Sequence, residues 1–344
     1  MKHRPVLTVF LLLTFSVLQA QLGGRNVFEF LNLPSSPRSA ALGGKVITVF
    51  DQDPSSAFFN PATINPEMDN QLALNYVNHL AGINYGTASY AYLLDRRFQV
   101  LHGGVTYINY GSFDGFDEQG NATGSFGAFE AALSVGYAHN FYQTDFYVGG
   151  NVKLINSKFD NYTSLGGAVD LGVFYDNPYS NIRAAVSLRN IGFQFVPFAD
   201  ERETLPFEII VGFSQKIPGL NVRYHITIDN LQQWDLTFNN PATATTNFDG
   251  QSESNEPGFF NNALRHTIVG VELFTESFFQ LRFGYNFRRA EELRTEGQRS
   301  FSGLNGGFEL DLGKWRISYT HSRFSNVTNT NLFGLHINLS GDRY

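Results

Sequence analysis

The segment F-Q-L-R-F-G-Y-N-F-R, residues 279–288, carries an apolar or aromatic side chain at every second position, with glycine, polar or charged residues between. Side chains of a β-strand point alternately to the two faces of a sheet, so a period of two is the signature of a strand. The alternation recurs at 221–229, where Arg223, His225 and Thr227 share one face. Each segment is therefore predicted to be a strand with one apolar and one polar face.

Fourteen segments of this kind follow residue 70, and each is long enough for the roughly 9–11 tilted residues with which a strand crosses a membrane. They are 71–79, 83–94, 98–109, 124–140, 145–158, 163–175, 180–191, 207–217, 220–230, 264–274, 277–288, 302–312, 314–324 and 331–341. Short links such as 217–219 alternate with longer polar links such as 192–206 and 231–263. Outer-membrane barrels have this rhythm of short periplasmic turns and long external loops. The prediction is an all-β fold, a transmembrane antiparallel β-barrel of about 14 strands with an N-terminal plug segment.

The composition favours the same class of protein. Charged residues make up 16% of the chain, against about 25% in typical globular domains. Aromatic residues reach 15%, yet after the N-terminus no apolar block is long enough for a membrane-spanning helix. The net charge of −7 comes without a basic block, which argues against nucleic acid as a partner. The chain has no cysteine, which excludes thiolate chemistry.

The N-terminus has the layout of a secretory signal peptide. Basic residues at 2–4 precede an apolar run at 6–18, which is too short to span a bilayer as a helix, and a small residue precedes Gln21. We expect 1–20 to be the signal peptide, and a buried core helix is the alternative.

Three parts of the chain and their location follow from this pattern. Residues 21–70 are expected to form an N-terminal periplasmic or plug segment, and 71–344 the outer-membrane β-barrel. The rule for turns and loops places both termini in the periplasm, below a bacterial outer membrane, and the 231–263 loop outside. Aromatic residues at strand ends are predicted to form interfacial girdles; they are Phe141, Tyr142, Phe174, Tyr175, Phe278, Phe279, Trp315 and Phe324.

The sequence gives little sign of catalysis. The histidines never pair at a metal-binding spacing, and no phosphate-binding loop or nucleophile elbow occurs. His225 and Asp229 share a strand face with other polar residues, so a polar lumen row is the better account of both. Asp51 and Asp53 lack the further ligands and the glycine of a calcium loop, and turn chemistry before Pro54 explains them better. We predict no enzyme activity, no cofactor and no metal.

The polar strand faces carry charges of both signs. The cations are Arg183, Arg189, Arg223, Arg282, Arg288 and Arg316, and the anions are Asp229, Glu272, Glu309 and Asp311. Neighbouring strands would let some of them pair across the lumen. Such a lining disfavours a channel with a hydrophobic lumen. It leaves open whether the charges rigidify a filled barrel or line a path for water.

Two stretches ahead of the strands carry a resemblance. They are N-V-F-E-F-L-N-L-P-S-S-P-R-S-A-A-L-G-G (26–44) and D-Q-D-P-S-S-A-F-F-N-P-A (51–62). They resemble the amino-terminal region of the PorV/PorQ family, outer-membrane proteins of the type IX secretion system of the Bacteroidetes, and F-E-F-L-N-L-P resembles its PorQ branch. The wider pattern of A-x-G-G, D-x-x-S and N-P-A is similar to the plug of fourteen-stranded fatty-acid-transporter (FadL-type) barrels. The specific motifs lie within 23–66, and Pro37 departs from the pattern.

On this basis the stretch is interpreted as a plug. Phe58 and Phe59 would be buried inside the barrel, while the residues after them turn the chain into the first strand. Gly43 and Gly44 would allow close backbone approach or a positive φ, and Arg38 could pair with a lumen carboxylate. The predicted plug residues are Arg38, Gly43, Gly44, Asp51, Asp53, Phe58, Phe59, Asn60 and Pro61. A periplasmic linker without a seat in the lumen is the alternative.

The resemblance implies a scaffold role in type IX secretion. Such a protein would hold a surface protein resembling PorZ, in a complex with PorU and PorV that processes cargo and attaches it to lipopolysaccharide. The external loops would form the docking surface, since aromatic anchors within a polar rim are what interfaces favour. The candidates are Trp234, Phe238, Phe248, Phe259 and Phe260 in the 231–263 loop, then Phe195 and Phe198 in the 192–206 loop. Aromatic residues that merely dip into the outer leaflet are the alternative.

A second function belongs to a different class. A FadL-type channel or transporter for small hydrophobic molecules would need an apolar pocket beneath the long loops and a gap in the wall near the plug. The charged strand faces argue against it, and the plug motif, which both families share, argues for it.

Overall fold

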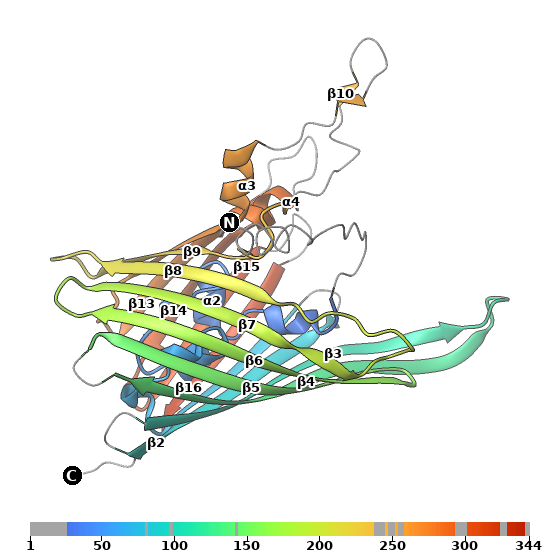
Figure 1. Cartoon of the computed structure of the whole chain (residues 1–344), viewed down its shortest axis with the longest axis horizontal. Coiled ribbons are helices and arrows are strands. Elements are labelled where there is room, and N and C mark those ends of the chain that lie inside the picture. The colour runs from blue at the N-terminus through green and yellow to red at the C-terminus, as the bar shows by residue number, and fades with distance from the viewer. Residues whose placement is uncertain are drawn as a thin grey trace, which may run out of the picture.

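The fold is a closed antiparallel β-barrel of fourteen strands (Figure 1), as the alternating segments predict. The computed structural model describes residues 26–79, 82–95, 99–141, 144–236, 245–246, 252–253, 258–292, 301–323 and 329–340. The expected signal peptide lies outside these residues. Each barrel strand pairs with the strands before and after it, and β1 (Gln71–Asn78) closes the ring against β16 (Asn329–Asn338).

The other strands and the helices have the following bounds. The barrel strands are β2 (Asn84–Asp95), β3 (Gln99–Phe116), β4 (Ala122–Asn140), β5 (Phe146–Phe159), β6 (Tyr162–Asn177), β7 (Ile182–Val196), β8 (Glu208–Lys216), β9 (Val222–Ile228), β12 (Thr267–Leu273), β13 (Phe279–Asn286), β14 (Leu304–Asp311) and β15 (Trp315–Arg323); a separate two-stranded sheet consists of β10 (Thr245–Thr246) and β11 (Ser252–Glu253). The helices are η1 (Glu29–Asn32), α2 (Pro37–Ala41), η2 (Pro54–Phe58), η3 (Pro61–Thr63), η4 (Pro66–Met68), α3 (Phe259–Arg265) and α4 (Phe287–Glu292), where η marks a 3-10 helix. In the described part of the chain, no helix combines the length and apolarity that crossing a membrane requires.

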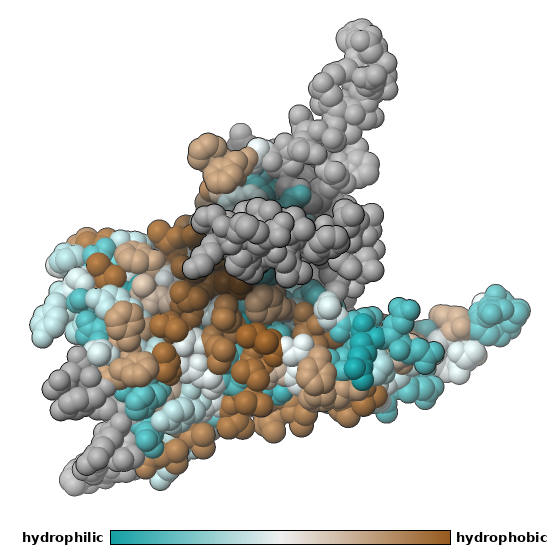
Figure 2. Space-filling model, in the orientation of Figure 1, coloured by the Kyte–Doolittle hydropathy of each residue, from teal (hydrophilic) through white to brown (hydrophobic). Residues whose placement is uncertain are grey.

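The alternation separates an apolar outer face from a polar inner one. In β5, Val152 and Leu154 are exposed on the outside, whereas Asn151 and Lys153 are buried inside the barrel. Figure 2 shows apolar side chains spread over the wall between the two ends of the barrel. An apolar band of this kind is the surface that barrels turn toward lipid.

The strands differ in length, so the rim of the barrel is uneven (Figure 1). β3 and β4 have 18 and 19 residues, whereas β9 and β12 have seven each. The largest difference from the sequence-based boundaries lies at 110–123, expected to be a loop. Much of that segment extends β3 and β4 as a hairpin, because backbone pairing continues where the apolar alternation has ended.

Candidate functional site

The plug, residues 26–70, runs through the barrel from one end to the other. At the end where the long links lie, here the loop end, the Val27 N–H donates to the Thr204 carbonyl at 3.0 Å. At the opposite turn end, Met68 packs with Ala91 and Val100. The plug thus has a seat in the lumen, and the linker alternative is wrong.

The direction of the plug bears on the expectation that both termini share one side. The first described residue, Asn26, lies at the loop end, whereas β16 finishes at the turn end. The two ends of the described chain are therefore on opposite sides. Val27 and Phe28 draw the chain to the loop end because they pack there with Leu205. The expected mature start, Gln21, lies outside the described residues.

Short polar residues followed by proline give the plug its irregular backbone. Asp53, Asn60 and Asn65 each accept a hydrogen bond from the backbone N–H two residues ahead, and a proline follows each to begin η2, η3 or η4. Ser36 caps α2 by accepting from the Ser39 N–H, three residues ahead, with Pro37 at the first helical position. Proline is favoured at that position because its missing N–H needs no partner there. This explains Pro37 and confirms the turn chemistry expected of Asp53.

The polar lining of the wall satisfies the backbone of the plug. Side chains of the wall donate to plug carbonyls: Asn151 to Ala57 at 2.7 Å, Ser187 to Phe59 at 2.7 Å, Thr320 to Pro37 at 2.7 Å and Asn286 to Gly43 at 3.2 Å. An irregular segment buried in a barrel would otherwise leave its carbonyl groups without partners. The inward polar residues therefore hold an occupant in the lumen.

Apolar residues and glycines complete the seat. Phe58 and Phe59 are buried as predicted, and Phe59 packs with Phe174 and Ile210 of the wall. η3 lies against inward-facing glycines. A Cβ added at Gly149 would stand 2.4 Å from the Pro61 carbonyl, so only glycine allows this approach. Gly43 and Gly44 adopt φ of 103° and 112°, also as predicted.

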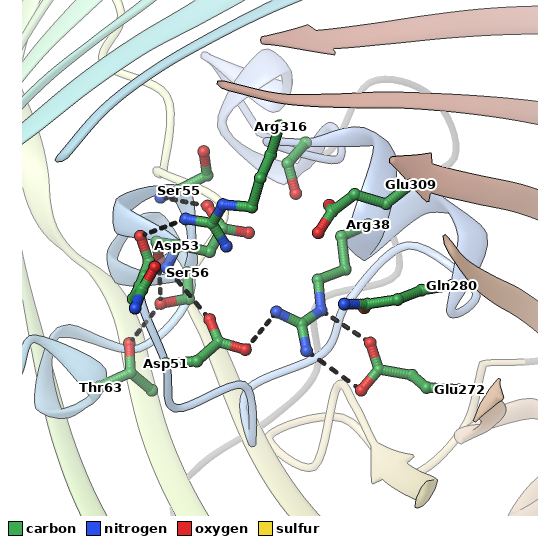
Figure 3. A network of polar contacts seen from close by, with 12 residues as sticks. Arg38, Asp51, Asp53, Ser55, Ser56, Thr63, Glu272, Gln280, Glu309 and Arg316 are labelled. Carbon is green, nitrogen blue, oxygen red and sulfur yellow. Dashed lines mark hydrogen bonds and ion pairs between the residues drawn. The ribbon is translucent and has the colours of Figure 1, made fainter. Parts of the chain in front are cut away.

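Arg38 lies between a carboxylate of the plug and one of the wall (Figure 3). Its Nη1 contacts Asp51 at 2.5 Å, while its Nε and Nη2 contact the two Glu272 oxygens at 2.7 and 3.1 Å. Glu272 also pairs with Arg282 at 2.9 Å, and Arg282 pairs with Glu309 at 3.0 Å. We call these five residues the Arg38 cluster. They confirm that Arg38 pairs with a lumen carboxylate and that the inward charges pair across strands.

Charge pairing keeps Asp51 ionised. Burial raises the pKa of its carboxyl. The neighbouring Arg38 and Arg316 guanidinium groups lower the pKa by more than burial raises it, so that the pKa lies well below its ordinary value. A lowered pKa in the folded state stabilises the plug at pH values above the ordinary pKa. That stabilisation is lost as the pH falls through the lowered value.

We therefore expect the plug to remain seated at neutral and mildly acidic pH, and to loosen only below about pH 4, the ordinary pKa of an aspartate. The measurement is ion conductance through single barrels in planar bilayers between pH 8 and pH 3. The Asp51→Asn variant serves as the matched control, since it lacks the titrating carboxylate. A rise in wild-type conductance between pH 7 and pH 5 would contradict the expectation.

A second ion-pair group holds the plug near β8 and β9. Lys45 contacts Glu208 and, at 3.1 Å, Asp229. Glu208 also pairs with Arg189 at 2.9 Å, and Arg288 lies 3.4 Å from Asp229. We call these residues the Lys45 cluster. Neither Lys45 nor Glu208 was among the candidates, because a single lysine in a loop gives no periodic signal that it will be buried.

A small cavity lies beside the plug. It has a volume of about 20 Å³ and lies between the plug residues Phe30, Leu31 and Phe58 and the wall residues Tyr85 and Lys153. This volume is sufficient for about one water molecule. The pocket that a hydrophobic channel would need is far larger. In the described residues, no group of three or more His, Cys, Asp or Glu side chains could hold a metal ion.

Strand pairing between β7 and β8 is incomplete at the loop end. Their strand pairing stops at Arg189, although β7 continues toward the loop end paired with β6 alone. Segment 203–206 covers the exposed edge through side chains: Asn190 donates to the Pro206 carbonyl at 2.9 Å, and the Glu203 N–H donates to Gln194 at 2.8 Å. Closure here depends on a few side-chain contacts.

An aromatic patch stands above the short strands β9 and β12. Trp234 stacks on His266 with ring centroids 5.1 Å apart and contacts Phe259 at 5.2 Å, and Phe259 contacts Phe260. The side chains of Trp234, Phe259 and Phe260 are 45%, 67% and 82% exposed. We call these three residues the α3 patch. Phe238 and Phe248, the other candidates in this loop, lie outside the described residues.

The candidates of the 192–206 loop lie elsewhere than expected. Phe195 belongs to β7 and lies on the outer wall, where its ring meets Phe193. Phe198 packs against Phe159, with ring centroids 5.7 Å apart, and is partly buried. The strand continues five residues farther than its apolar alternation indicated, because a bulge at Asn190, with φ of 58°, shifts the register.

One of the predicted girdle residues faces the wrong way. Phe174 is fully buried and contacts the plug, where its ring stacks on Phe50 at 4.7 Å. Phe141, Phe278 and Trp315 are exposed on the outside, as predicted. Tyr142 and Phe324 lie outside the described residues. Phe174 points inward because the even-numbered residues of β6 face the lumen.

Comparisons with known proteins support the fold. No protein-family model and no curated protein sequence matches the chain. Among solved structures, the deltaS2S3 mutant of the monoaromatic hydrocarbon channel TodX aligns with a TM-score of 0.50 and 12% identity, over 88% of this chain and 97% of that one. A triple mutant of the Rhodopseudomonas blastica porin gives 0.29 and 9%, over 78% and 96%, and CdiB from Acinetobacter baumannii gives 0.33 and 8%, over 78% and 59%. The likeness to TodX shows a FadL-like outer-membrane barrel fold.

Proposed function

We propose that this barrel is a non-enzymatic anchor, which holds a surface protein at its loop end and conducts nothing through its lumen. The filled lumen carries the proposal. Both ion-pair clusters fix the plug to the wall, and the cavity beside it has room for about one water. A conduit needs free space, whereas an anchor needs a rigid interior.

The sequence resemblance supplies the finer part of the proposal. The protein would act as the PorQ branch of the PorV/PorQ family does, in the outer membrane of a type IX secretion system. Its partner would be a surface protein resembling PorZ, with PorU and PorV in the same complex and lipopolysaccharide as the acceptor of cargo. The support for this assignment is the pair of plug stretches at 26–44 and 51–62.

The first test is affinity purification of the tagged protein from detergent-solubilised outer membrane. We expect a stoichiometric surface protein together with a sortase-like protein. A barrel recovered alone, with a hydrophobic molecule inside, would contradict the anchor and favour the channel.

The α3 patch is the first candidate for docking. Replacing Trp234, Phe259 and Phe260 with alanine should weaken partner binding at least about 30-fold, the effect of losing one interface residue worth about 2 kcal/mol. The barrel should stay folded, because the three side chains are largely exposed. Partner binding to the immobilised barrel is measured by surface plasmon resonance.

The matched control replaces two exposed aromatic residues of the turn end, Tyr179 and Phe278, with alanine. This variant should bind the partner like wild type. Unchanged binding by the α3 patch variant would remove the patch from the docking surface and favour its insertion into the outer leaflet.

The second candidate function is a channel for small hydrophobic molecules. The incomplete strand pairing between β7 and β8 and the TodX-like fold favour it. A monoaromatic hydrocarbon is a suitable probe, because TodX is a channel for that class. Saturable uptake into vesicles containing the purified barrel, above that of protein-free vesicles, would support the channel. Uptake equal to the protein-free rate would support the anchor.

A further inference from the structure

A hairpin projects beyond the rest of the barrel at the loop end (Figure 1). The pairing of β3 with β2 ends at Asn109, and the pairing of β4 with β5 begins only at Ala128. Beyond the pair Gly111↔Ala128, the ladder continues from Ser112↔Gly127 to Phe116↔Ala122, and no other described strand joins it. At its base the Asp160 N–H donates to the Gly127 carbonyl at 3.3 Å. We call 110–127 the projecting hairpin.

In the part of the chain that the structure describes, neither edge of the projecting hairpin has a neighbouring strand. Exposed edges carry unpaired N–H and C=O groups and can accept another strand, and proteins commonly protect them with lysine or proline. Residues 110–127, Y-G-S-F-D-G-F-D-E-Q-G-N-A-T-G-S-F-G, contain no lysine, arginine or proline. The hairpin therefore keeps two edges open to an extended chain.

One face of the projecting hairpin is aromatic. Phe113 stands opposite Phe126, and their rings stack with centroids 5.5 Å apart. Phe116 is 64% exposed and lies on the other face, because no residue is inserted in β3 between Phe113 and Phe116. Side chains of an added strand could pack against the Phe113–Phe126 pair on one face or against Phe116 on the other, as cross-strand aromatic pairs do.

The charges of the projecting hairpin have one sign. Asp114, Asp117 and Glu118 give three carboxylates, and the segment has no cation. Asp117 uses its carboxylate to hold the turn, accepting from Gln119 and Asn121, whereas Asp114 and Glu118 are exposed. An anionic lipid surface would be repelled by these charges, and a basic segment attracted.

We propose that the projecting hairpin is a docking edge for an extended, basic segment of the surface partner, which adds a strand to the hairpin. In this mode of recognition main-chain hydrogen bonds supply affinity, and side-chain contacts supply specificity. The inference rests on the proposed anchor function and identifies a contact separate from the α3 patch.

Two variants test the docking edge. The first replaces 112–127 with Asn-Gly, which joins Gly111 and Ala128 across a two-residue hairpin turn. The second, Asp114→Lys with Glu118→Lys, keeps the hairpin and reverses its charge. Asp200→Lys with Glu201→Lys is the matched control, since it reverses two exposed carboxylates of the same end outside the hairpin.

The measurement is the affinity of each variant for the partner that co-purifies with wild type, at low and high salt. We expect at least about tenfold weaker binding for the charge-reversal variant at low salt, a larger loss for the shortened one, and no change for the control. Hydrogen exchange of the wild-type complex should show slowed amides within 110–127 when the partner binds. All three proteins should run as folded, heat-modifiable barrels.

The outcomes separate the two proposals. If both variants bound the partner with wild-type affinity, or if hydrogen exchange in 110–127 did not change on binding, the docking edge would be overturned and the anchor would stand. Absence of any surface protein with the wild-type barrel would overturn the anchor, and the docking edge with it.

Discussion

Replacing Arg38 with alanine is expected to unseat the plug while the fourteen strands stay closed. Arg38 is the plug residue that Glu272 contacts through both carboxylate oxygens, and its loss leaves Asp51 without its ion-pair partner inside the barrel. Removal of one partner from a buried ion pair destabilises by about 3–5 kcal/mol. The strands keep their own hydrogen bonds, so the effect should be confined to the plug.

The absence of cysteine allows a clean measurement of plug release. Ser56 is buried in η2, and a Ser56→Cys variant carries the only thiol of the chain. Its reaction with a maleimide should be slow in the otherwise wild-type barrel. With Arg38→Ala added, the rate should rise on the order of a hundredfold or more. Arg202→Ala, an exposed arginine at the loop end, is the control. If Ser56→Cys reacted at the same rate with and without Arg38→Ala, the other plug contacts would be sufficient to keep the plug seated.

Replacing Gly149 with valine is expected to displace the plug by a different route. A Cβ at this position would lie 2.4 Å from the Pro61 carbonyl, so η3 must move or the strand must bend. Overpacking usually costs about 1–3 kcal/mol, and here the added side chain meets backbone atoms of Pro61, which cannot rotate away as a flexible side chain could. We expect stepwise ion conductance in planar bilayers, where the wild-type barrel stays closed.

The neighbouring Gly150 provides a matched control on the same strand. It faces the outside, and its added Cβ would meet other atoms only at 3.6 Å or more. Gly150→Val should therefore insert, fold and remain closed like wild type. Conductance from both variants would point to a damaged wall, and conductance from neither would show that η3 can shift without leaving the lumen.

The barrel could be predicted because its signal is repeated fourteen times. A strand that separates lipid from a polar lumen must alternate apolar and polar side chains. Every segment identified by this alternation is a strand of the barrel. Two segments pair as strands although their sequences do not alternate. The projecting hairpin has no apolar residue at every second position to mark it, and the bulge at Asn190 hides the continuation of β7.

The plug could be predicted only in its parts. Burial of Phe58 and Phe59 and the pairing of Arg38 follow from side-chain chemistry. The direction of the plug does not, because direction depends on which wall carboxylates and carbonyl partners its segments reach. The repeated pairing of a capping residue with proline, at Ser36, Asp53, Asn60 and Asn65, is a signal that could have predicted the chain of short helices.

The continuity of plug and first strand constrains how the protein can assemble. The plug leaves the lumen at the turn end and continues directly as β1, which pairs with the last strand, β16, over eight residues to close the ring. To enter a finished ring, the plug would have to pass its whole length through the lumen and form its contacts with the wall one after another. We therefore expect the sheet to curl around the plug, with the seam between β1 and β16 forming last. The N-terminal segment, which is made first, would then be the template around which the remaining strands fold.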